Sequence, residues 1–385
     1  MKTYKKIIIA FYASSRRPSE YRSGAEFIRF AGGLGFDLAV IADLADNDDQ
    51  SHFTDYAPGI DIVRVPSPLK AQASFYKYGD FVAQLIWQRR AAKWIRQHAA
   101  DAEVIWILNG AQPWFPIKNY FLAHNKVIWG PIGGGALPPP ALLAKMSRSA
   151  AFREHVRGWL EALSFVLLRR NLKHIAPDRL IAFARTSEAQ RRLKSKIPGL
   201  DAPIIPEILV PLKSREIARS PQQAPRFLWV GQDVPRKNLP LALDIFARLR
   251  QAHFPEATLD IYGCDRSSAP PGVVYHGWVP RIDWDSYRDQ GVLLLTSYRE
   301  GLPSVILEAI SAGLLCVTSD TGALASLRLD SLYVMPAADY PVVSEPIIDV
   351  VGEKVRAHLA KATVSIPLLD FRQDLVQHLD QHGLL

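Results

Sequence analysis

Two glutamates with seven residues between them, Glu300 and Glu308, combine residue type and spacing in a way that suits ligand chemistry. Glu300 follows the apolar run GVLLLTS, whereas Glu308 lies within Val305–Ile310, an apolar stretch that must pack against a neighbouring element. A carboxylate in such surroundings is costly unless it accepts hydrogen bonds. Sugar or ribose hydroxyls could donate these bonds. Backbone amides or a nearby arginine could do so too, and the residues alone leave both explanations open.

Pro303 marks the start of the helix that carries Glu308. Proline suits a first helical position, because the amide that it lacks would have no partner there. The free amides of this first turn, near Leu302 and Ser304, can receive a diphosphate with the help of the helix dipole. The sequence therefore predicts an anion site between the two glutamates.

The elements that position these residues follow an alternating pattern of apolar runs and helical periodicity, which is typical of βαβ units and parallel sheets. In the first half we expect strands at 6–13, 36–42, 60–65, 103–108, 126–129 and 179–184, with helices at 24–35, 75–98 and 151–173. In the second half we expect strands at 226–231, 258–262, 273–277, 291–297 and 315–319, with helices at 238–252, 284–290 and 303–312.

A proline-rich seam at about 201–225 separates the two halves, and 385 residues exceed what one hydrophobic core usually supports. We therefore expect an α/β protein with two doubly wound, Rossmann-like domains that face a central cleft. The expected domains are an acceptor-side domain at 1–205 and a nucleotide-sugar-binding domain at 206–365. A helical tail at 366–385 could pack back on the first domain.

The composition predicts a folded, cytosolic protein with anionic partners. Lysine and arginine number 46 against 38 aspartates and glutamates, so the net charge of +8 favours nucleotide phosphates, acidic lipid headgroups or nucleic acid. Cys264 and Cys316 lie in apolar runs and are interpreted as reduced thiols. The sequence contains no run of about eighteen apolar residues, the length that a membrane-spanning helix needs. We therefore expect a cytoplasmic chain, with peripheral attachment to a membrane left open.

The run EGLPSVILEAISAG resembles the paired-glutamate signature of the retaining GT-B glycosyltransferases of family 4. The surrounding segments resemble the same family in order and spacing, namely FLWVGQDVPRKNLPLALDIFARL, LDIYG, VVYHGWV and CVTSDTGAL. An ordered series of this kind is far more specific than a single motif. The resemblance implies the GT-B fold and a donor site in the second domain.

The resemblance also implies a role for individual positions. Glu308 would hold the ribose hydroxyls of the donor, and Glu300 would contact the transferred sugar. Lys237 would neutralise the diphosphate as the nucleotide leaves. From the residues alone, Lys237 could instead be a solvated charge near a helix start. The remaining positions expected at the donor site are Gly301, Leu302, Pro303, Gly231, Trp278 and Val279, the last two beside the base.

Two positions depart from the family pattern, one in the expected diphosphate clamp and one in an expected contact to the sugar. Gln232 stands where the family usually carries a second diphosphate-binding arginine, and Arg236 is the candidate that could replace this charge. Relatives often place a histidine near the end of the strand at 103–108, where it meets the sugar, but Trp106 or its neighbours stand there.

The segment VIWGPIGGGALP in the first domain resembles a loop of bacterial family 4 members, many of them associated with lipopolysaccharide or other surface polysaccharides. Gly133, Gly134 and Gly135 would let the backbone approach a ligand closely and expose amides to anionic groups. A merely flexible connector is the alternative. Asn109 and Gln112 are further candidates for contacts in this domain, although each could be an ordinary loop residue.

No metal site is expected, neither one of the Asp-x-Asp kind nor a zinc site. Asp283 and Asp285 imitate the Asp-x-Asp metal motif of another glycosyltransferase fold, but their place before a helical pattern suits an N-cap and a first turn. His276 is interpreted as a structural or cleft-lining side chain. We expect no cofactor and no metal, with the nucleotide-diphosphate sugar as a substrate.

The stretch 152–173 interleaves apolar residues with arginine and lysine. A helix of that composition can lie on an anionic membrane. It is equally typical of a helix that packs between domains and exposes a basic face. An anionic inner-membrane surface therefore stands as one candidate partner.

Together these features predict a hexosyltransferase-type enzyme that moves a sugar, with retention, from a UDP- or GDP-linked donor to a glycan or lipid-linked acceptor. Bacterial exopolysaccharide or lipopolysaccharide synthesis is the expected setting, and nucleic acid is not an expected partner. Two alternatives stay open. One is a nucleotide-sugar epimerase or phosphorylase on the same fold, and the other is a degenerate, non-catalytic binding subunit.

Overall fold

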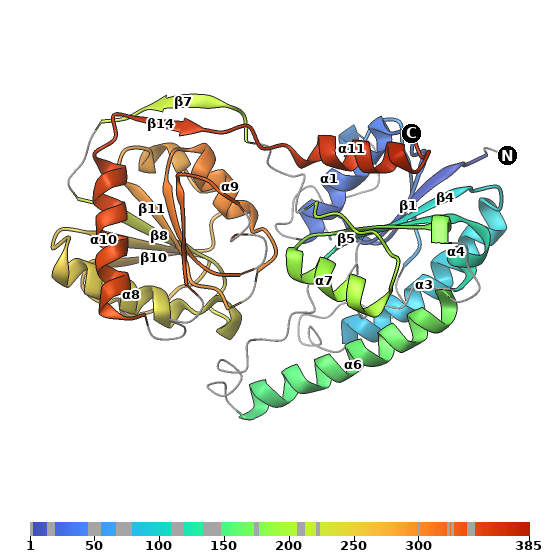
Figure 1. Ribbon diagram of the computed structural model, residues 1–385, viewed down its shortest axis with the longest axis horizontal. Coiled ribbons are helices and arrows are strands. Elements are labelled where there is room, and N and C mark those ends of the chain that lie inside the picture. The colour runs from blue at the N-terminus through green and yellow to red at the C-terminus, as the bar shows by residue number, and fades with distance from the viewer. Residues whose placement is uncertain are drawn as a thin grey trace. The chain divides into compact units, whose positions relative to one another are not determined.

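The computed structural model describes residues 3–13, 20–44, 55–66, 79–108, 119–133, 148–172, 177–205, 212–220, 224–298, 300–321, 324, 327–336 and 343–385. These residues divide into two compact units (Figure 1). The first unit comprises the described parts of Met1–Leu137, Arg148–Leu209 and Phe371–Leu385. The second unit comprises those of Val210–Asp370.

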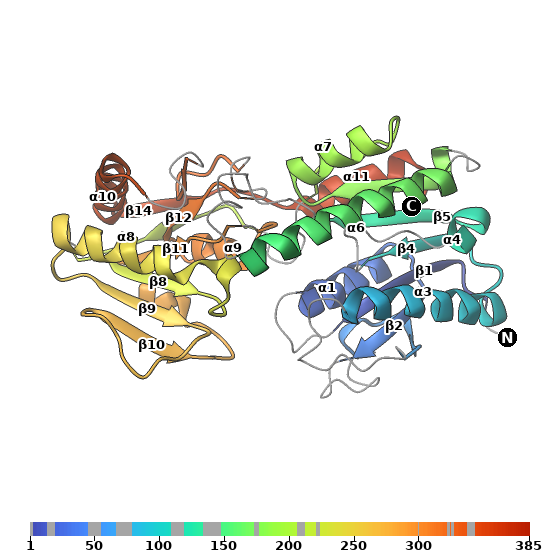
Figure 2. The ribbon, with the colours of Figure 1, turned by 90° about the horizontal axis from the view of Figure 1, so that it is seen from below.

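Each unit is built on a six-stranded parallel sheet with the same strand order. The first sheet runs in the order β3-β2-β1-β4-β5-β6, formed by Asp61–Arg64, Leu38–Leu44, Lys6–Ala13, Val104–Ile107, Lys126–Ile132 and Leu180–Ala184. The second runs in the order β10-β9-β8-β11-β12-β13, formed by Val273–Gly277, Thr258–Tyr262, Arg226–Val230, Gly291–Leu295, Leu315–Ser319 and Leu332–Met335. Figure 2 shows β10, β9, β8 and β11 side by side in this order. Both sheets are therefore doubly wound, as the sequence predicts.

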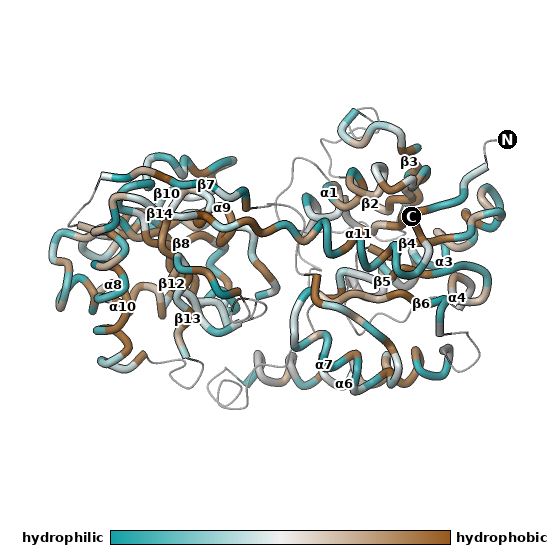
Figure 3. The backbone as a smooth tube through the Cα atoms, turned by 45° about the horizontal axis from the view of Figure 1, so that its top comes forward, coloured by the Kyte–Doolittle hydropathy of each residue, from teal (hydrophilic) through white to brown (hydrophobic). Residues whose placement is uncertain are grey.

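Helices cover both faces of each sheet, which explains why the strands read as continuous apolar runs. Every residue of β4, β6, β11 and β12 is buried. Figure 3 shows this pattern as hydrophobic strands inside each unit with hydrophilic segments around them.

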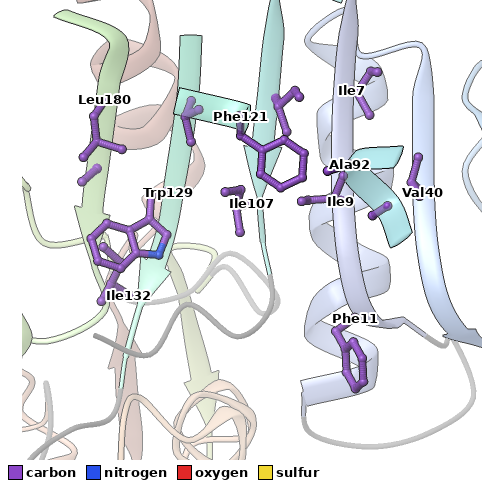
Figure 4. Packing of buried hydrophobic residues seen from close by; sticks show 14 of the residues in the cluster. Ile7, Ile9, Phe11, Val40, Ala92, Ile107, Phe121, Trp129, Ile132 and Leu180 are labelled. Atoms are coloured by element: carbon purple, nitrogen blue, oxygen red, sulfur yellow. The ribbon is translucent and has the colours of Figure 1, made fainter. Parts of the chain in front are cut away.

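The first unit has a hydrophobic core on each face of its sheet. One core is formed with α3 (Gly79–His98), α4 (Asn119–His124), α6 (Arg148–Leu172) and α7 (Ser187–Lys196). Figure 4 shows part of it, where Trp129 of β5 and Phe121 of α4 pack among the aliphatic residues of the strands. The other core is formed with α1 (Glu20–Gly33) and α11 (Phe371–Gln381). Leu375 and Leu379 of α11 are fully buried in it, so the C-terminal helix is part of the first unit.

In the second unit, α8 (Leu239–Ala252) and α10 (Glu345–Leu359) cover one face of the sheet. The shorter α9 (Ser304–Ser311) contacts β12 from the other face, where Cys316 points its thiol toward the carbonyl of Ile306. Two 3-10 turns also belong to this unit. The turn η3 (Pro235–Lys237) follows β8, and η4 (Trp284–Tyr287) lies between β10 and β11. Both cysteines are free, and burial raises the pKa of the Cys316 thiol.

A small antiparallel sheet in the second unit pairs a strand near the start of that unit with one near its end. β7 (Arg215–Ala218) pairs with β14 (Thr363–Ile366), and Leu212 bridges to Leu369. The sequence predicted only an irregular, proline-rich seam here. The short strands were missed because their pairing partner lies far along the chain and their alternation covers only four residues each.

The helix predicted at 284–290 is a correction, since only the 3-10 turn η4 forms there. Side chains at positions i and i+3 lie on the same side of a 3-10 turn. Trp284 and Tyr287 have this spacing, and both hydrogen-bond inward, to Glu308 and to Asp260. Asp283 occupies the predicted N-cap position, but its side chain makes no capping hydrogen bond.

Candidate active site

The loops after β8 and β11 define the candidate site. These neighbouring strands lie where the strand order reverses, and open parallel sheets bind ligands outside the carboxyl ends of strands at such a switch point. Hydrogen bonds hold the two loops together, because Tyr298 donates its backbone N–H to the Arg236 carbonyl (2.9 Å) and Thr296 donates its hydroxyl to the Asn238 carbonyl (2.9 Å).

The turn after β8 requires close backbone packing. Gly231 donates its N–H to the Tyr262 carbonyl at 2.9 Å. Gly263, which follows β9, has a φ of +93°, and a Cβ atom there would lie 2.5 Å from the Gly231 carbonyl oxygen. Only glycine fits this position. The packing fixes the start of the loop that carries Gln232, an exposed residue, and the basic pair beyond it.

Glu300 forms the centre of a charged cluster with Lys237 and Arg236. Lys237 Nζ lies 2.7 Å and Arg236 Nη1 lies 3.0 Å from Glu300 Oε1. The side chains of Glu300 and Lys237 are only 10% and 16% exposed, whereas that of Arg236 is 45% exposed. Lys237 is therefore a partly desolvated charge and not the solvated one that the sequence left open. Two cations against one carboxylate leave the cluster with a net positive charge.

Leu302 and Pro303 lead from this cluster into α9. Leu302 is 4% exposed, and Pro303 is the N-cap residue, so α9 begins at Ser304, one position after the predicted start. Since no side chain caps this end, the first amides of α9, at Ser304 and Val305, have no intrahelical acceptor. They lie at the positive end of the helix dipole.

Glu308 lies one turn further along α9 and accepts a hydrogen bond from Trp284 Nε1 at 3.3 Å. It lines a pocket of about 500 Å³. The other lining residues are Arg215, Arg281, Ile282, Asp283, Trp284, Asp285, Ser311 and Ala312. Sequence reasoning expected backbone amides, an arginine or a ligand as the partner of Glu308 and missed Trp284. A tryptophan in a loop gives no local signal that it points toward a carboxylate 24 residues away.

Trp278 and Val279 directly follow β10, as the sequence predicted, and Trp278 is 72% exposed. The pocket beside Glu308 is lined by residues further along this loop, at 281–285. The structure therefore adds Arg281 and Trp284 to the residues near Glu308.

A buried polar network supports η4, the turn that carries Trp284. Asp260 is 3% exposed and accepts hydrogen bonds from Tyr287 (2.9 Å) and Arg226 Nε (2.7 Å). His276 Nε2 lies 2.6 Å from the same carboxylate, and the ring of His276 stacks on Tyr262. Burial, followed by hydrogen bonding, raises the pKa of Tyr287. His276 therefore has a structural partner, in agreement with the structural interpretation.

In the first unit, Gly133 directly follows β5, whereas Gly134, Gly135, Asn109 and Gln112 lie outside the described residues. Trp106 is fully buried in β4 and donates its Nε1–H to the Gly130 carbonyl at 2.9 Å. It is a core residue and does not offer the sugar contact that a histidine would provide.

Among the described residues, no group of three or more histidine, cysteine, aspartate or glutamate side chains is placed to hold a metal ion. Within the same part of the chain, no helix is long and apolar enough to cross a membrane.

Comparison with known proteins identifies the class. Residues 212–328, which include the charged cluster and both glutamates, match the family described as Glycosyl transferases group 1. The chain therefore contains a glycosyl transferases group 1 domain on a GT-B fold, and it is an enzyme of the glycosyltransferase class. No curated protein sequence matches the chain.

Solved structures share this fold over the whole chain. The apo form of the lipopolysaccharide outer core galactosyltransferase WaaB is 16% identical, with 98% of this chain and 99% of that chain covered and a TM-score of 0.55. Sucrose-phosphate synthase from Thermosynechococcus elongatus is 12% identical, with 99% and 96% covered and a TM-score of 0.58. At these identities the likeness concerns the fold alone.

Proposed function

We propose that the chain is a retaining glycosyltransferase that moves a sugar from a UDP- or GDP-linked donor to a glycan or lipid-linked acceptor. The observation that carries this proposal is the cluster of Glu300, Lys237 and Arg236 beside the open N-terminus of α9. Cations and free amides converge there, at the switch point of a sheet, as the binding of a diphosphate requires.

The arrangement divides the donor into parts with separate partners. Lys237, Arg236 and the first amides of α9 hold the diphosphate. Glu308, oriented by Trp284, accepts hydrogen bonds from the ribose, and the pocket lined by 281–285 takes the base. The transferred sugar then lies near Glu300, Gly301 and Leu302. Each role is assigned from position and charge.

Catalysis in this proposal rests on charge stabilisation and positioning. Negative charge develops on the diphosphate as the sugar leaves, and in this proposal Lys237 stabilises that charge without a metal ion. The leaving phosphate takes the acceptor proton on the same face of the sugar, so that the anomeric configuration is retained. Retention is proposed from the paired glutamates, which resemble the retaining family 4 signature.

We further propose that the acceptor belongs to a bacterial surface polysaccharide or lipopolysaccharide. The resemblance of the segment around Gly133 supports this setting, together with the fold shared with a lipopolysaccharide galactosyltransferase. An anionic membrane surface would then hold the acceptor.

Helix α6 is the surface that we propose for membrane attachment on the cytoplasmic side. Phe152, Trp159 and Val166 are 63–69% exposed, and Leu163 is 44% exposed. Their spacing places them on one face, opposite Phe165 and Leu168, which are buried in the first unit. The exposed arginines Arg148 and Arg170 lie on the same face at its two ends. We call this face the α6 stripe.

A screen of nucleotide sugars tests the proposed function. The thermal midpoint of the purified chain is measured with UDP-, GDP-, ADP- and CDP-linked hexoses. A donor that raises the midpoint is then incubated with membrane lipid extract while proton NMR follows the anomeric signal. A product with the anomeric configuration of the donor supports the proposal. An inverted product contradicts retention, donor isomerisation without transfer indicates an epimerase, and binding without turnover indicates a non-catalytic subunit.

A further inference from the structure

The carboxyl ends of β5 and β6 bring together two residues to which the donor site gives no role. Gly133 directly follows β5, and Arg185 directly follows β6. The backbone N–H of Arg185 donates to the Ile132 carbonyl at 2.8 Å, so the two loop starts are joined. A Cβ atom on Gly133 would lie 3.3 Å from Arg185 Cδ, closer than an ordinary contact. The glycine backbone therefore lies directly against the arginine side chain.

One nitrogen of the Arg185 guanidinium group has an unmet hydrogen-bonding requirement. Its Nε atom is buried, and no described residue accepts a hydrogen bond from it. Arg226 pairs with Asp260 and Arg248 pairs with Glu345, each at 2.7 Å. The Nε atom of Arg219 is also buried without a partner, but both terminal nitrogens of that arginine donate to backbone carbonyls, of His358 and of Asp289. A buried donor without an acceptor is costly, and either a bound water or a bound anion would remove this cost.

We propose that Arg185, together with the backbone at Gly133, binds a phosphate or diphosphate group of the acceptor. The planar guanidinium matches the oxygen geometry of a phosphate, and a glycine allows such a group to approach the main chain. The carboxyl edge of an open parallel sheet is also where ligands bind. The inference rests on the proposed function for naming the acceptor as the source of the phosphate. The anion site itself does not depend on it.

Arginine side-chain NMR tests this site directly. Protein with ¹⁵N-labelled arginine gives Nε–H resonances, and that of Arg185 is assigned by its loss in Arg185→Lys. Inorganic phosphate and pyrophosphate are titrated at constant ionic strength, with the donor site filled by whichever nucleoside diphosphate the protein binds. We expect a saturable shift of the Arg185 resonance with both anions, larger for pyrophosphate if the site takes a diphosphate. Acetate should cause no shift.

Arg179 provides a matched control because it lies at the opposite end of the same strand, where its Nη1 donates to the Ala123 carbonyl at 3.0 Å. Arg185→Gln should weaken pyrophosphate binding at least about tenfold, whereas Arg179→Gln should leave it unchanged. Both variants should keep the thermal midpoint and the nucleoside diphosphate affinity of the native chain.

An Arg185 resonance that does not move, or that moves as much with acetate, would overturn the inference. Unchanged pyrophosphate affinity in Arg185→Gln would overturn it as well. If Arg185→Gln does not fold, the titration of the native protein still decides. Failure of the proposed function would look different, since no nucleoside diphosphate would bind while the Arg185 titration could still succeed.

Discussion

Lys237 Nζ lies 2.7 Å from Glu300 Oε1, so the carboxylate proposed to contact the sugar is paired with the cation proposed to hold the diphosphate. Arg236 Nη1 approaches the same oxygen at 3.0 Å. A diphosphate must therefore share with Glu300 the cations that attract it. In the proposed donor site, the carboxylate therefore opposes the binding of the nucleotide and favours its release after transfer.

Replacing Glu300 by Gln should consequently change binding and turnover in opposite directions. Without the carboxylate, both cations are available to the diphosphate, and we expect the dissociation constant of the nucleoside diphosphate to fall about three- to tenfold. Transfer should slow by about tenfold or more because a contact to the sugar is lost. Calorimetry and initial rates measure the two effects, with the exposed Glu256→Gln as a control. Weaker nucleotide binding in Glu300→Gln would contradict the competition.

Glu308→Gln should have the opposite effect on nucleotide affinity. The amide donates where the carboxylate accepts from ribose hydroxyls, so the dissociation constant should rise about tenfold. Trp284→Phe keeps the aromatic ring and removes only the 3.3 Å hydrogen bond to Glu308, so it should have a smaller effect in the same direction. Equal nucleotide affinities in the native chain and in Glu308→Gln would show that Glu308 does not belong to the donor site.

Much of this fold is predictable from local pattern. The strands at 6–13, 258–262, 273–277 and 315–319 have the predicted bounds, because each is an apolar run ended by a turn. Ion pairs between separate loops of the site are harder to predict from local sequence pattern. The sequence placed Lys237 and Glu300 at one site, but it did not predict that they contact each other across 62 intervening residues.

The residues that sequence reasoning missed have in common that their partners are distant. Trp284 hydrogen-bonds to Glu308, and Arg185 lies against Gly133, because the sheet brings the loops that carry these residues together. The β7–β14 pair depends on a return of the chain almost 150 residues later. Periodicity and turn chemistry describe neighbours in sequence, so they cannot report these contacts.

Lys237→Ala should slow transfer at least about tenfold, since one charge-assisted contact to phosphate contributes roughly 1.5–3 kcal/mol. Arg236→Ala should cost less, because that side chain is more exposed. Gln232→Arg should be tolerated or should tighten donor binding. We expect EDTA to change the rate little. Loss of activity with EDTA and rescue by Mg²⁺ or Mn²⁺ would show that a metal neutralises the diphosphate, and an unchanged rate in Lys237→Ala would exclude this lysine.

Stability should decrease as the pH falls through the range in which buried His358 resists protonation. Burial, aided by the nearby Arg219, lowers the pKa of His358 from 6.5 to about 4, while its Nε2 lies 3.0 Å from the Gly313 carbonyl. The unfolded chain therefore binds a proton below about pH 6.5 that the folded chain refuses until about pH 4, so stability rises with pH across this window.

The thermal midpoint, measured from pH 4.5 to 7.5 in small steps, checks this prediction. His358→Gln removes the titrating group and keeps a side-chain donor for the Gly313 carbonyl, so its midpoint should depend less steeply on pH in this window. The exposed His98→Gln is the control and should keep the native slope. Parallel slopes in all three proteins would show that His358 does not govern the acid sensitivity.

The α6 stripe should bind anionic vesicles and not neutral ones. Each arginine near an anionic surface contributes roughly 1 kcal/mol, so Arg148→Gln with Arg170→Gln should weaken binding roughly thirtyfold. Trp159→Ser should weaken it further by removing apolar area from the interface. Salt should oppose binding of the native chain, because the attraction is screened. Sedimentation with phosphatidylglycerol vesicles, compared with phosphatidylcholine alone, measures each effect.

The control for the α6 stripe is a second basic helix with the same change of charge. Lys93 and Arg96 are exposed on α3, so Lys93→Gln with Arg96→Gln also removes two positive charges from the first unit. If net charge alone attracted the protein to the membrane, both double variants would lose affinity equally. A specific role for the α6 stripe requires that only the Arg148 and Arg170 pair matter, and that the Trp159→Ser effect persist at high salt. Equal losses, or none in either variant, would leave α6 as a packing helix with a basic outer face.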